Sequence, residues 1–348
     1  MRILIATGIY PPDIGGPAQY AVNVEKVWKS WGHHVDIKTF RLERKLPTVI
    51  RHVWYFFKCA PSAVRADFIF ILDTFSVAVP AVLLGKIFGK KTIIRTGGDF
   101  LWESYVERTG DLVLLKNFYL PAQRTSRQAG QTSVGKFSFK EKVIFKLTRW
   151  ALKNASAIIF STEWQKNIFL KAYELDTEKL SVIENYYGPK EISFEPIKKD
   201  FIAGTRPLKW KNEKRLAEAF ERVKEKGEVL ICDNEAKPFS VFMERLAHCY
   251  AVILVSLGDI SPNMILDAIR HNKPFILTKE TGLYERVKDC AIFVDPESVD
   301  DIAAKIEWLL DERNYEAQYQ KIRAFTFTHS FEQIGSETLA VYRSISHS

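Results

Sequence analysis

The sequence is poor in the residues that build disulfide frameworks and zinc sites. It holds four cysteines in 348 residues, and no two of them have CxxC spacing. Scattered cysteines indicate neither a disulfide framework nor a zinc site, and they favour a reducing, cytoplasmic compartment. No GxGxxG, GKT or DxD motif occurs, so the sequence predicts no dinucleotide fingerprint, no P-loop and no DxD metal site. The cysteines are Cys59, Cys232, Cys249 and Cys290.

No apolar run is long and uninterrupted enough to predict a transmembrane helix. The nearest candidate, residues 68–85, is broken by Asp73 and Pro80, and it barely reaches the roughly 18 residues that a span needs. We expect a buried strand followed by a core helix there. Met1 leads directly into the strand-like run RILIAT, with neither the basic n-region nor the cleavage site of a signal peptide.

Length and charge set the broad class. A chain of 348 residues exceeds the usual size of a single hydrophobic core, so two domains are expected. Residues 1–199 hold 30 Lys and Arg against 18 Asp and Glu, whereas the remainder holds 20 against 24. A basic first half suits nucleic acid, an anionic membrane surface or an acidic substrate, and charge alone does not choose among them.

Residues 256–285, SLGDISPNMILDAIRHNKPFILTKETGLYE, carry the most informative pattern. The apolar runs at 251–257 and 273–278 predict two buried parallel strands. Between them we expect a helix with Ser261 as its N-cap and Pro262 in its first position. Because unpaired N–H groups and the macrodipole attract anions to a helix N-terminus, a phosphate is expected there. The residues expected around it are Ser261, Pro262, Asn263 and Met264.

Two aspartates flank this predicted phosphate site. Asp259 precedes the helix, and seven residues separate it from Asp267, which lies about 7 to 8 Å along the helix. That distance is close to the reach from a phosphate to a ribose. Carboxylates on both sides of a phosphate suit a nucleotide sugar, although a plain βαβ unit with two solvated acids remains the alternative.

Further candidates lie in the first half. Gly15 and Gly16, in GIYPPDIGG (8–16), let backbone approach a phosphate or sugar before a helix at 17–31, or they make only a tight connection. The strand KTIIRT (91–96) ends in GGDFLWE, which places Asp99 and Glu103 where open α/β sheets bind ligands. Alternatively, Asp99 caps a helix that starts at Phe100.

Two segments predict basic amphipathic helices. Residues 41–66 combine an aromatic cluster at 54–57 with several bases, which is typical either of an amphipathic surface helix or of a core helix with solvated bases. Residues 140–155 place an apolar stripe beside lysines and arginines. Residues 121–136 show no periodicity and are expected to form a mobile loop.

The chain resembles glycosyltransferase family 4 over nearly its whole length. The resemblance rests on four stretches of the sequence. They are two acids separated by seven residues with SPN between them, the run TGLYE, the run YPPDIGGPAQY and the run FIAGTRPLKWKNEK. It implies an α/β fold of the GT-B type, in which two Rossmann-like domains with parallel sheets face across a cleft. We expect an acceptor-side domain, a hinge, a nucleotide-sugar donor domain reduced by about one βα unit, and a returning C-terminal helix. The expected ranges are 1–188, 189–200, 201–326 and 327–348.

The resemblance also implies roles for residues. Arg206 and Lys211 neutralise a diphosphate leaving group, Asp259 contacts the sugar and Asp267 the ribose, although the family's usual pair is Glu and Glu. The acceptor side holds Asp99, Trp102 and Glu103. The resemblance further implies that catalysis retains anomeric configuration and needs no metal or other cofactor.

The expected function is therefore transfer of a sugar from a nucleotide sugar, a UDP- or GDP-sugar, to a glycan or lipid-linked acceptor. The expected place is the cytoplasm, peripheral to an anionic membrane surface, with no nucleic acid partner. A non-catalytic scaffold that binds an anionic surface or glycan is the alternative, and a sugar-nucleotide epimerase is the third hypothesis. The shortened second domain and the Asp pair favour the scaffold.

Overall fold

The computed structural model of the protein divides into two compact units. The first contains Met1–Leu101, Phe137–Asn185 and His329–Ser348, and the second contains Trp102–Lys136 and Tyr186–Thr328. The structure describes residues 1–13, 15–41, 43, 46–120, 137–203, 207–225, 231–233 and 239–346. The loop predicted at 121–136 lies outside these ranges.

The first unit is built on a six-stranded parallel sheet with strand order β2-β1-β3-β4-β5-β6. Its central strands are apolar and buried on both faces, as parallel strands between two helix layers are. In register, Ile3 lies between Val35 on β2 and Phe68 on β3. The strands are β1 Arg2–Thr7, β2 His34–Thr39, β3 Phe68–Leu72, β4 Lys91–Thr96, β5 Ala157–Phe160 and β6 Leu180–Val182.

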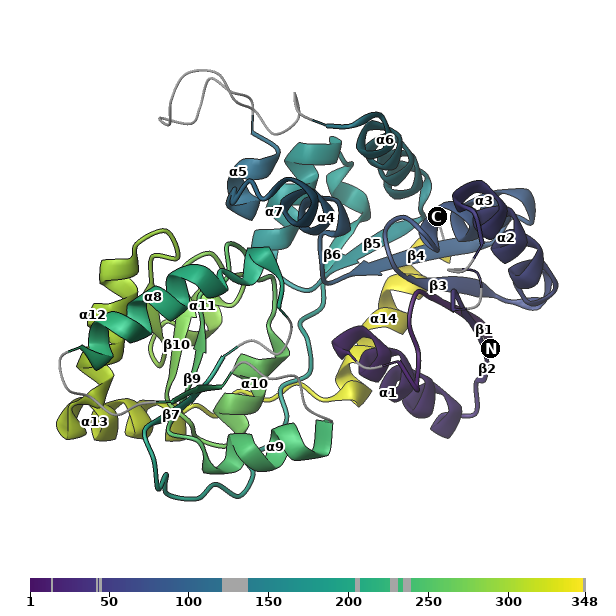
Figure 1. Cartoon of the computed structure of the whole chain (residues 1–348). Coiled ribbons are helices and arrows are strands. Elements are labelled where there is room, and N and C mark those ends of the chain that lie inside the picture. Colours follow the sequence, from purple (N-terminus) through teal and green to yellow (C-terminus); the bar gives the residue numbers. More distant parts are fainter. Residues whose placement is uncertain are drawn as a thin grey trace. The chain divides into compact units, whose positions relative to one another are not determined.

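Helices cover both faces of this sheet, as Figure 1 shows. On one face α1 (Gly16–Ser30) packs against α14 (Phe331–Ser346), where the buried Trp28 donates its indole N–H to the Gly335 carbonyl oxygen at 3.2 Å. The right-handed crossovers between successive strands place the remaining helices on the other face. These are α2 Thr48–Arg65, α3 Ala78–Ile87, α6 Phe139–Asn154 and α7 Glu163–Tyr173, with the short turn η4 Thr177–Lys179 before β6.

The second unit contains a five-stranded parallel sheet with strand order β11-β10-β9-β7-β8. Successive residues of β9 serve two cores, because side chains along a strand alternate between faces. Ala251 and Ile253 join the core under α8 and α12, while Val252 and Leu254 join the core under α10. The strands are β7 Asp200–Ile202, β8 Ile231–Asp233, β9 Ala251–Leu254, β10 Phe275–Thr278 and β11 Ile292–Val294.

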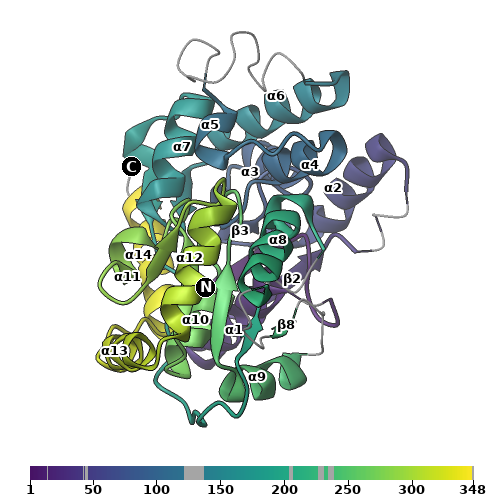
Figure 2. The same cartoon turned by 60° about the vertical axis from the view of Figure 1, so that its left-hand side comes forward.

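The helices of the second unit come from two parts of the chain. Most lie between residues 209 and 323: η5 Lys209–Lys211, α8 Glu213–Lys224, α9 Phe239–His248, α10 Asn263–Arg270, α11 Tyr284–Val287, α12 Val299–Leu310 and α13 Glu312–Arg323. The other two helices, α4 Phe100–Thr109 and α5 Leu115–Phe118, follow β4 of the first sheet in the chain. The second unit contains α4 from Trp102 onward and all of α5. Figure 2 shows the same elements from a second direction.

Several local predictions are confirmed. Residues 68–85 form β3 and most of α3, and no helix in the described ranges is long and apolar enough to cross a membrane. Residues 2–7 and 91–96 form strands with the predicted bounds. The run at 251–257 forms a shorter strand than predicted, because residues 255–257 leave the sheet and bend toward η5, where Leu257 N–H donates to Trp210 O at 2.9 Å.

Candidate functional site

The centre of the candidate site is an ion pair in the second unit. Lys211 Nζ lies 2.7 Å from Asp259 Oδ2, and the Ser256 hydroxyl donates to the same oxygen at 2.8 Å. The Lys211 and Asp259 side chains are only 14% and 12% exposed. Lys211 ends the turn η5, whereas Ser256 and Asp259 follow the carboxyl end of β9. Ligands of open α/β sheets bind at this end of the strands.

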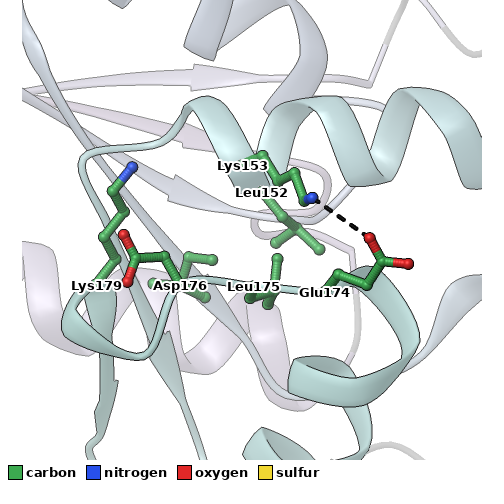
Figure 3. Close-up of a pocket in the computed structure, with 7 residues that line it drawn as sticks. Leu152, Lys153, Glu174, Leu175, Asp176 and Lys179 are labelled. Carbon is green, nitrogen blue, oxygen red and sulfur yellow. Dashed lines mark ion pairs between the residues drawn. The ribbon is translucent and has the colours of Figure 1, made fainter.

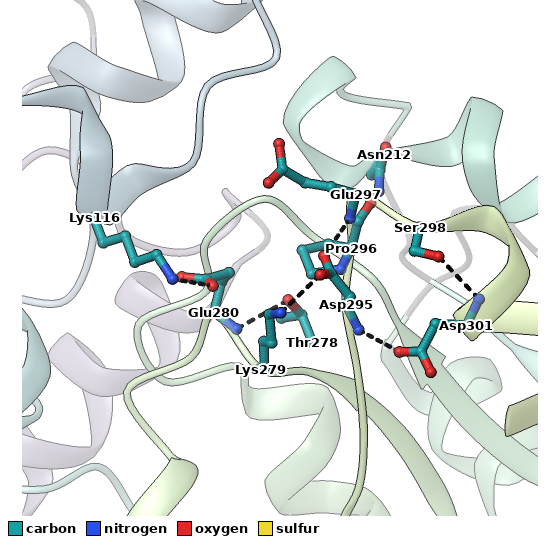
Figure 4. Close-up of polar contacts among 10 residues, drawn as sticks. All are labelled: Lys116, Asn212, Thr278, Lys279, Glu280, Asp295, Pro296, Glu297, Ser298 and Asp301. Carbon is teal, nitrogen blue, oxygen red and sulfur yellow. Dashed lines mark hydrogen bonds and ion pairs between the residues drawn. The ribbon is translucent and has the colours of Figure 1, made fainter. Parts of the chain in front are cut away.

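Asn212 holds Lys211 in place. Its backbone has a φ of 65°, a left-handed conformation that asparagine tolerates better than most residues. Its buried side-chain amide donates to Val255 O at 3.0 Å and to Pro296 O at 2.6 Å, and Figure 4 shows the second contact. These bonds tie η5 to β9 and to the loop before α12, so Lys211 is positioned by a rigid support.

The loop after β10 fixes the backbone of Asp259. Asp259 N–H donates to Glu280 O at 2.9 Å, and Gly282 N–H donates to Asp259 O at 3.1 Å. The Glu280 side chain is almost fully buried, and its carboxylate lies 2.5 Å from Lys116 Nζ (Figure 4). The carboxylate therefore links the loops of the site to α5, which comes from a distant part of the sequence.

The α4–α5 segment packs beside the same loops. Leu115 N–H donates to Leu257 O at 3.1 Å, and a Cβ on Gly258 would lie 2.5 Å from Leu115 Cβ. At the other end of the segment, the ring centroids of Trp102 and Trp210 lie 5.5 Å apart. Only glycine fits at position 258, because any side chain would collide with α5.

The N-terminus of α10 differs from the prediction by one residue. The N-cap is Pro262 rather than Ser261, and the helix begins at Asn263. This N-cap residue makes no side-chain hydrogen bond to the helix. Pro262 has φ −69° and ψ 113°, so its backbone is extended and its carbonyl accepts the first intrahelical bond, from Ile265 N–H at 3.0 Å. The first-turn N–H groups of Asn263 and Met264 have no intrahelical acceptor, as in any helix. They supply the anion-attracting end that the sequence predicts.

Asp267 is held by its own ion pair. Arg270 Nη1 lies 3.0 Å from Asp267 Oδ1, and the same guanidinium also pairs with Glu191. Burial raises the pKa of Asp267 to about 7. The arginine approaches the Gly188 backbone closely, since a Cβ there would lie 2.6 Å from Arg270 Nε. The ion pair with Arg270 therefore fixes the position of Asp267. A ribose hydroxyl that binds this carboxylate would have to bind beside Arg270 or displace it.

The remaining predicted residues lie elsewhere. Gly15 is the N-cap of α1 with a φ of 148°, which favours glycine, and Gly16 starts that helix in the first unit. Asp99 is buried after β4 in the first unit, beside the Gly98 carbonyl, which accepts from Gln165 at 3.3 Å. Trp102 and Glu103 belong to α4 in the second unit, and Trp102 is buried with its indole N–H donating to Val113 O at 2.9 Å. Arg206 lies outside the described residues.

Three residues at the site were missed by the sequence patterns. Ser256 lies three positions before Asp259, so a search for polar residues around the first acid would have found it. Glu280 is the acid next to TGLYE, and its burial is visible only in the fold. Nothing local marks Lys116, which lies 164 positions from Glu280 in the sequence.

A separate hollow lies on the first unit. Figure 3 shows it at the C-terminal ends of α6 and α7, where the Lys153 ammonium lies 3.8 Å from the Glu174 carboxylate. Lys179 and Asp176 also line it, so cations and carboxylates balance across a short distance. None of the predicted site residues lines this hollow, and its balanced charge does not indicate which kind of ligand would bind there.

Within the described residues, no group of three or more His, Cys, Asp or Glu side chains is arranged to hold a metal ion. The candidate site instead gathers a lysine, a carboxylate and a helix N-terminus at the carboxyl end of one parallel sheet. That arrangement has the chemistry of a phosphate and hydroxyl site.

The two parallel-sheet units define the GT-B fold, and solved structures of that fold match the whole chain. The catalytic domain of starch synthase IV from Arabidopsis thaliana, bound to ADP and acarbose, is similar with a TM-score of 0.66 at 12% identity, covering 99% of each chain. Anabaena Alr3699/HepE in complex with UDP-glucose is similar with a TM-score of 0.60 at 14% identity, covering 100% of this chain and 98% of that one.

The apo form of the lipopolysaccharide outer core galactosyltransferase WaaB is also similar, with a TM-score of 0.65 at 13% identity, covering 99% of this chain and 100% of that one. No protein-family model matches the sequence, and no curated protein sequence matches it. At these identities the likeness establishes the fold, and the activity is argued below.

Proposed function

We propose that the protein is a glycosyltransferase that moves a sugar from a nucleotide sugar to a glycan or lipid-linked acceptor. The observation that carries this proposal is the Lys211–Asp259 pair at the carboxyl end of β9, next to the N-terminus of α10. The Lys211 ammonium and the N-terminus of α10 would bind the negative charge of a diphosphate, and the Asp259 carboxylate would accept hydrogen bonds from sugar hydroxyls. Among the similar structures, HepE is in complex with UDP-glucose and the catalytic domain of starch synthase IV is bound to ADP and acarbose, which supports a nucleotide-sugar donor here.

In the proposed reaction, Lys211 and Arg206 stabilise the negative charge that grows on the departing diphosphate, together with the N–H groups of Asn263 and Met264. Asp259 binds the sugar hydroxyls and strengthens its contact as the ring becomes cationic. Asp267 binds the ribose, and Asp99 orients or deprotonates the attacking acceptor hydroxyl. Gly15 and Gly16 allow the acceptor-side backbone to approach the substrate closely.

We further propose that anomeric configuration is retained and that no metal or other cofactor takes part. The resemblance to retaining family 4 enzymes supports the first proposal. The charges of Lys211 and Arg206, which would do a metal's work on the diphosphate, support the second. Proton NMR of the first-formed product and transfer assays in excess EDTA test the two proposals independently.

Lys211→Ala tests the role of the cation. Transfer from the accepted nucleotide sugar should slow by about 10² to 10³-fold, because the lost charge acts most strongly in the transition state. The affinity for the nucleoside diphosphate, measured by calorimetry, should fall much less. Lys288→Ala is the matched control, since Lys288 is an exposed lysine of the same unit that pairs with its neighbour Glu285.

Two outcomes would contradict the proposal. If the wild type binds no common nucleoside diphosphate, the second unit is not a donor site and the scaffold hypothesis is favoured. If wild type and Lys211→Ala turn over at the same rate, Lys211 serves only the structure. Conversion of the donor without any acceptor would instead point to an epimerase.

A further inference from the structure

The outer face of α2 is apolar, which is unusual for a helix on the surface of a protein. The side chains of Val49, Trp54 and Phe57 are 75%, 61% and 66% exposed, and those of Ile50, Val53 and Val64 are exposed as well. The first five of these positions repeat at spacings of three or four residues and Val64 lies two turns after Phe57, so they form one stripe along a helix of 18 residues. The buried side of α2 carries Tyr55, Cys59 and Ala63 instead. The sequence left open whether the bases of this segment face solvent over a core helix, and the structure shows that its outer face is hydrophobic.

The stripe is one part of a larger surface. Helices α2, α3 and α6 lie in one layer on the same face of the first sheet, with α3 packed against both of the others (Figure 1). Leu83, Ile87 and Phe88 are exposed on and just after α3. On α6, Phe139 is 83% exposed, and Val143 and Leu147 follow it at four-residue spacing. All three helices therefore present apolar side chains outward.

The charge on this layer has one sign. Neither α2 nor α3 contains an acidic residue, and the single carboxylate of α6, Glu141, is buried in a capping box with Ser138. Of the bases on these helices, Lys58 pairs with Glu43, while Arg149 and Lys153 pair with Glu174. The exposed bases of the layer are Arg65, Lys86, Lys140, Lys142, Lys146 and Lys153.

We propose that the outer surface of α2, α3 and α6 docks on an anionic membrane. Apolar side chains next to lysines, on helices that carry no exposed carboxylate of their own, match the acyl boundary and the negative headgroups of such a surface. The basic charge distinguishes this occupant from a second copy of the chain, whose identical layer would repel it. The proposal deepens the proposed use of a lipid-linked acceptor, but vesicle binding is measured without any sugar transfer, so the two proposals fail separately.

The test is co-sedimentation of the full chain with vesicles of phosphatidylcholine alone or mixed with phosphatidylglycerol. The wild type should bind the anionic vesicles at least about 10-fold better, and binding should weaken as salt is added. The double variant Trp54→Ser/Phe57→Ser should lose about 10-fold or more in binding. Its control is Trp308→Ser, which removes a tryptophan that is 40% exposed in the second unit.

A second variant tests the charge. Lys140→Glu/Lys146→Glu should abolish the preference for anionic vesicles, whereas Lys288→Glu/Lys321→Glu, which reverses two exposed lysines of the second unit, should leave it within about twofold. Circular dichroism spectra and melting temperatures should be the same for all of these variants as for the wild type, which would show that each remains folded.

Equal binding of the wild type to neutral and anionic vesicles would overturn the proposal, and so would no binding to either. A wild-type dimer in solution that Trp54→Ser/Phe57→Ser converts to a monomer would also overturn it, because the layer would then be an interface between copies of the chain.

Discussion

Lys211 Nζ and Asp259 Oδ2 lie 2.7 Å apart in the second unit, so the cation proposed to bind a diphosphate is already neutralised by a carboxylate. A diphosphate that binds Lys211 must compete with Asp259. The carboxylate therefore lowers the affinity for the leaving group while it contributes to binding of the sugar. This opposition leads to the first prediction.

Asp259→Asn should tighten the binding of a nucleoside diphosphate by about 3- to 10-fold and slow sugar transfer. The amide keeps the size of the carboxylate but removes the negative charge that competes for Lys211 and that stabilises the cationic sugar. Calorimetry and initial rates measure the two effects. Asp289→Asn, at an exposed position of the same unit, is the control for the change in net charge. Weaker diphosphate binding in Asp259→Asn would contradict the prediction.

Lys116→Met should destabilise the second unit by about 1 to 3 kcal/mol, because the nearly buried Glu280 carboxylate would lose its ionic partner. Thermal unfolding measures the loss. Lys116→Met/Glu280→Gln should recover most of it, since the amide does not leave an unpaired charge. If the double variant is no more stable than Lys116→Met, the pair does not couple α5 to the loop after β10.

Asp267 should make folding depend on pH. Burial raises its pKa from an ordinary value of 3.8 to about 7, so between these pH values the folded state keeps a proton that the unfolded state has released. This contribution to stability is present at low pH and is lost as pH rises toward 7, by at most about 1.4 kcal/mol per pH unit.

Asp267→Asn mimics the protonated carboxyl and should remove this part of the pH dependence. The measurement is the free energy of unfolding by urea at intervals between pH 4 and pH 8, with Asp289→Asn as the exposed control. Identical pH profiles for wild type and Asp267→Asn would show that burial of Asp267 has no energetic consequence. In the proposed reaction, Asp267→Ala should chiefly raise the KM for the donor, because ribose contacts change little in the transition state.

Asp99→Asn distinguishes a catalytic carboxylate from a structural one. Asp99 is a buried residue that follows the end of β4 in the chain. A general base contributes about 10² to 10⁴-fold, so the variant should lose transfer by that factor while binding nucleoside diphosphates normally. A lower melting temperature with an unchanged transfer rate would instead identify Asp99 as a helix cap.

Local patterns were enough to predict most of the secondary structure. Strands such as β1 and β4 follow from short runs of β-branched and apolar residues, and α10 follows from its apolar face. The start of α10 was wrong by one residue, because local chemistry favours Ser261 as the cap and Pro262 in the first turn, whereas in the structure Pro262 has an extended backbone and precedes the helix. The loop backbone around Asp259, bonded to Glu280 and Gly282, selects between them only in the folded unit.

By itself, the sequence determined the alternating strands and helices, the basic first half and the position of two aspartates around a helix N-terminus. The tertiary structure decided which of these side chains meet. Lys211 reaches Asp259 because β7 and β9 are neighbours in the sheet, and Lys116 reaches Glu280 because α5, which belongs to the second unit, packs beside Leu257. The tertiary structure also decided that the apolar stripe of α2 faces outward. Periodicity in the sequence reveals that a helix has two faces, but only packing decides which face is buried.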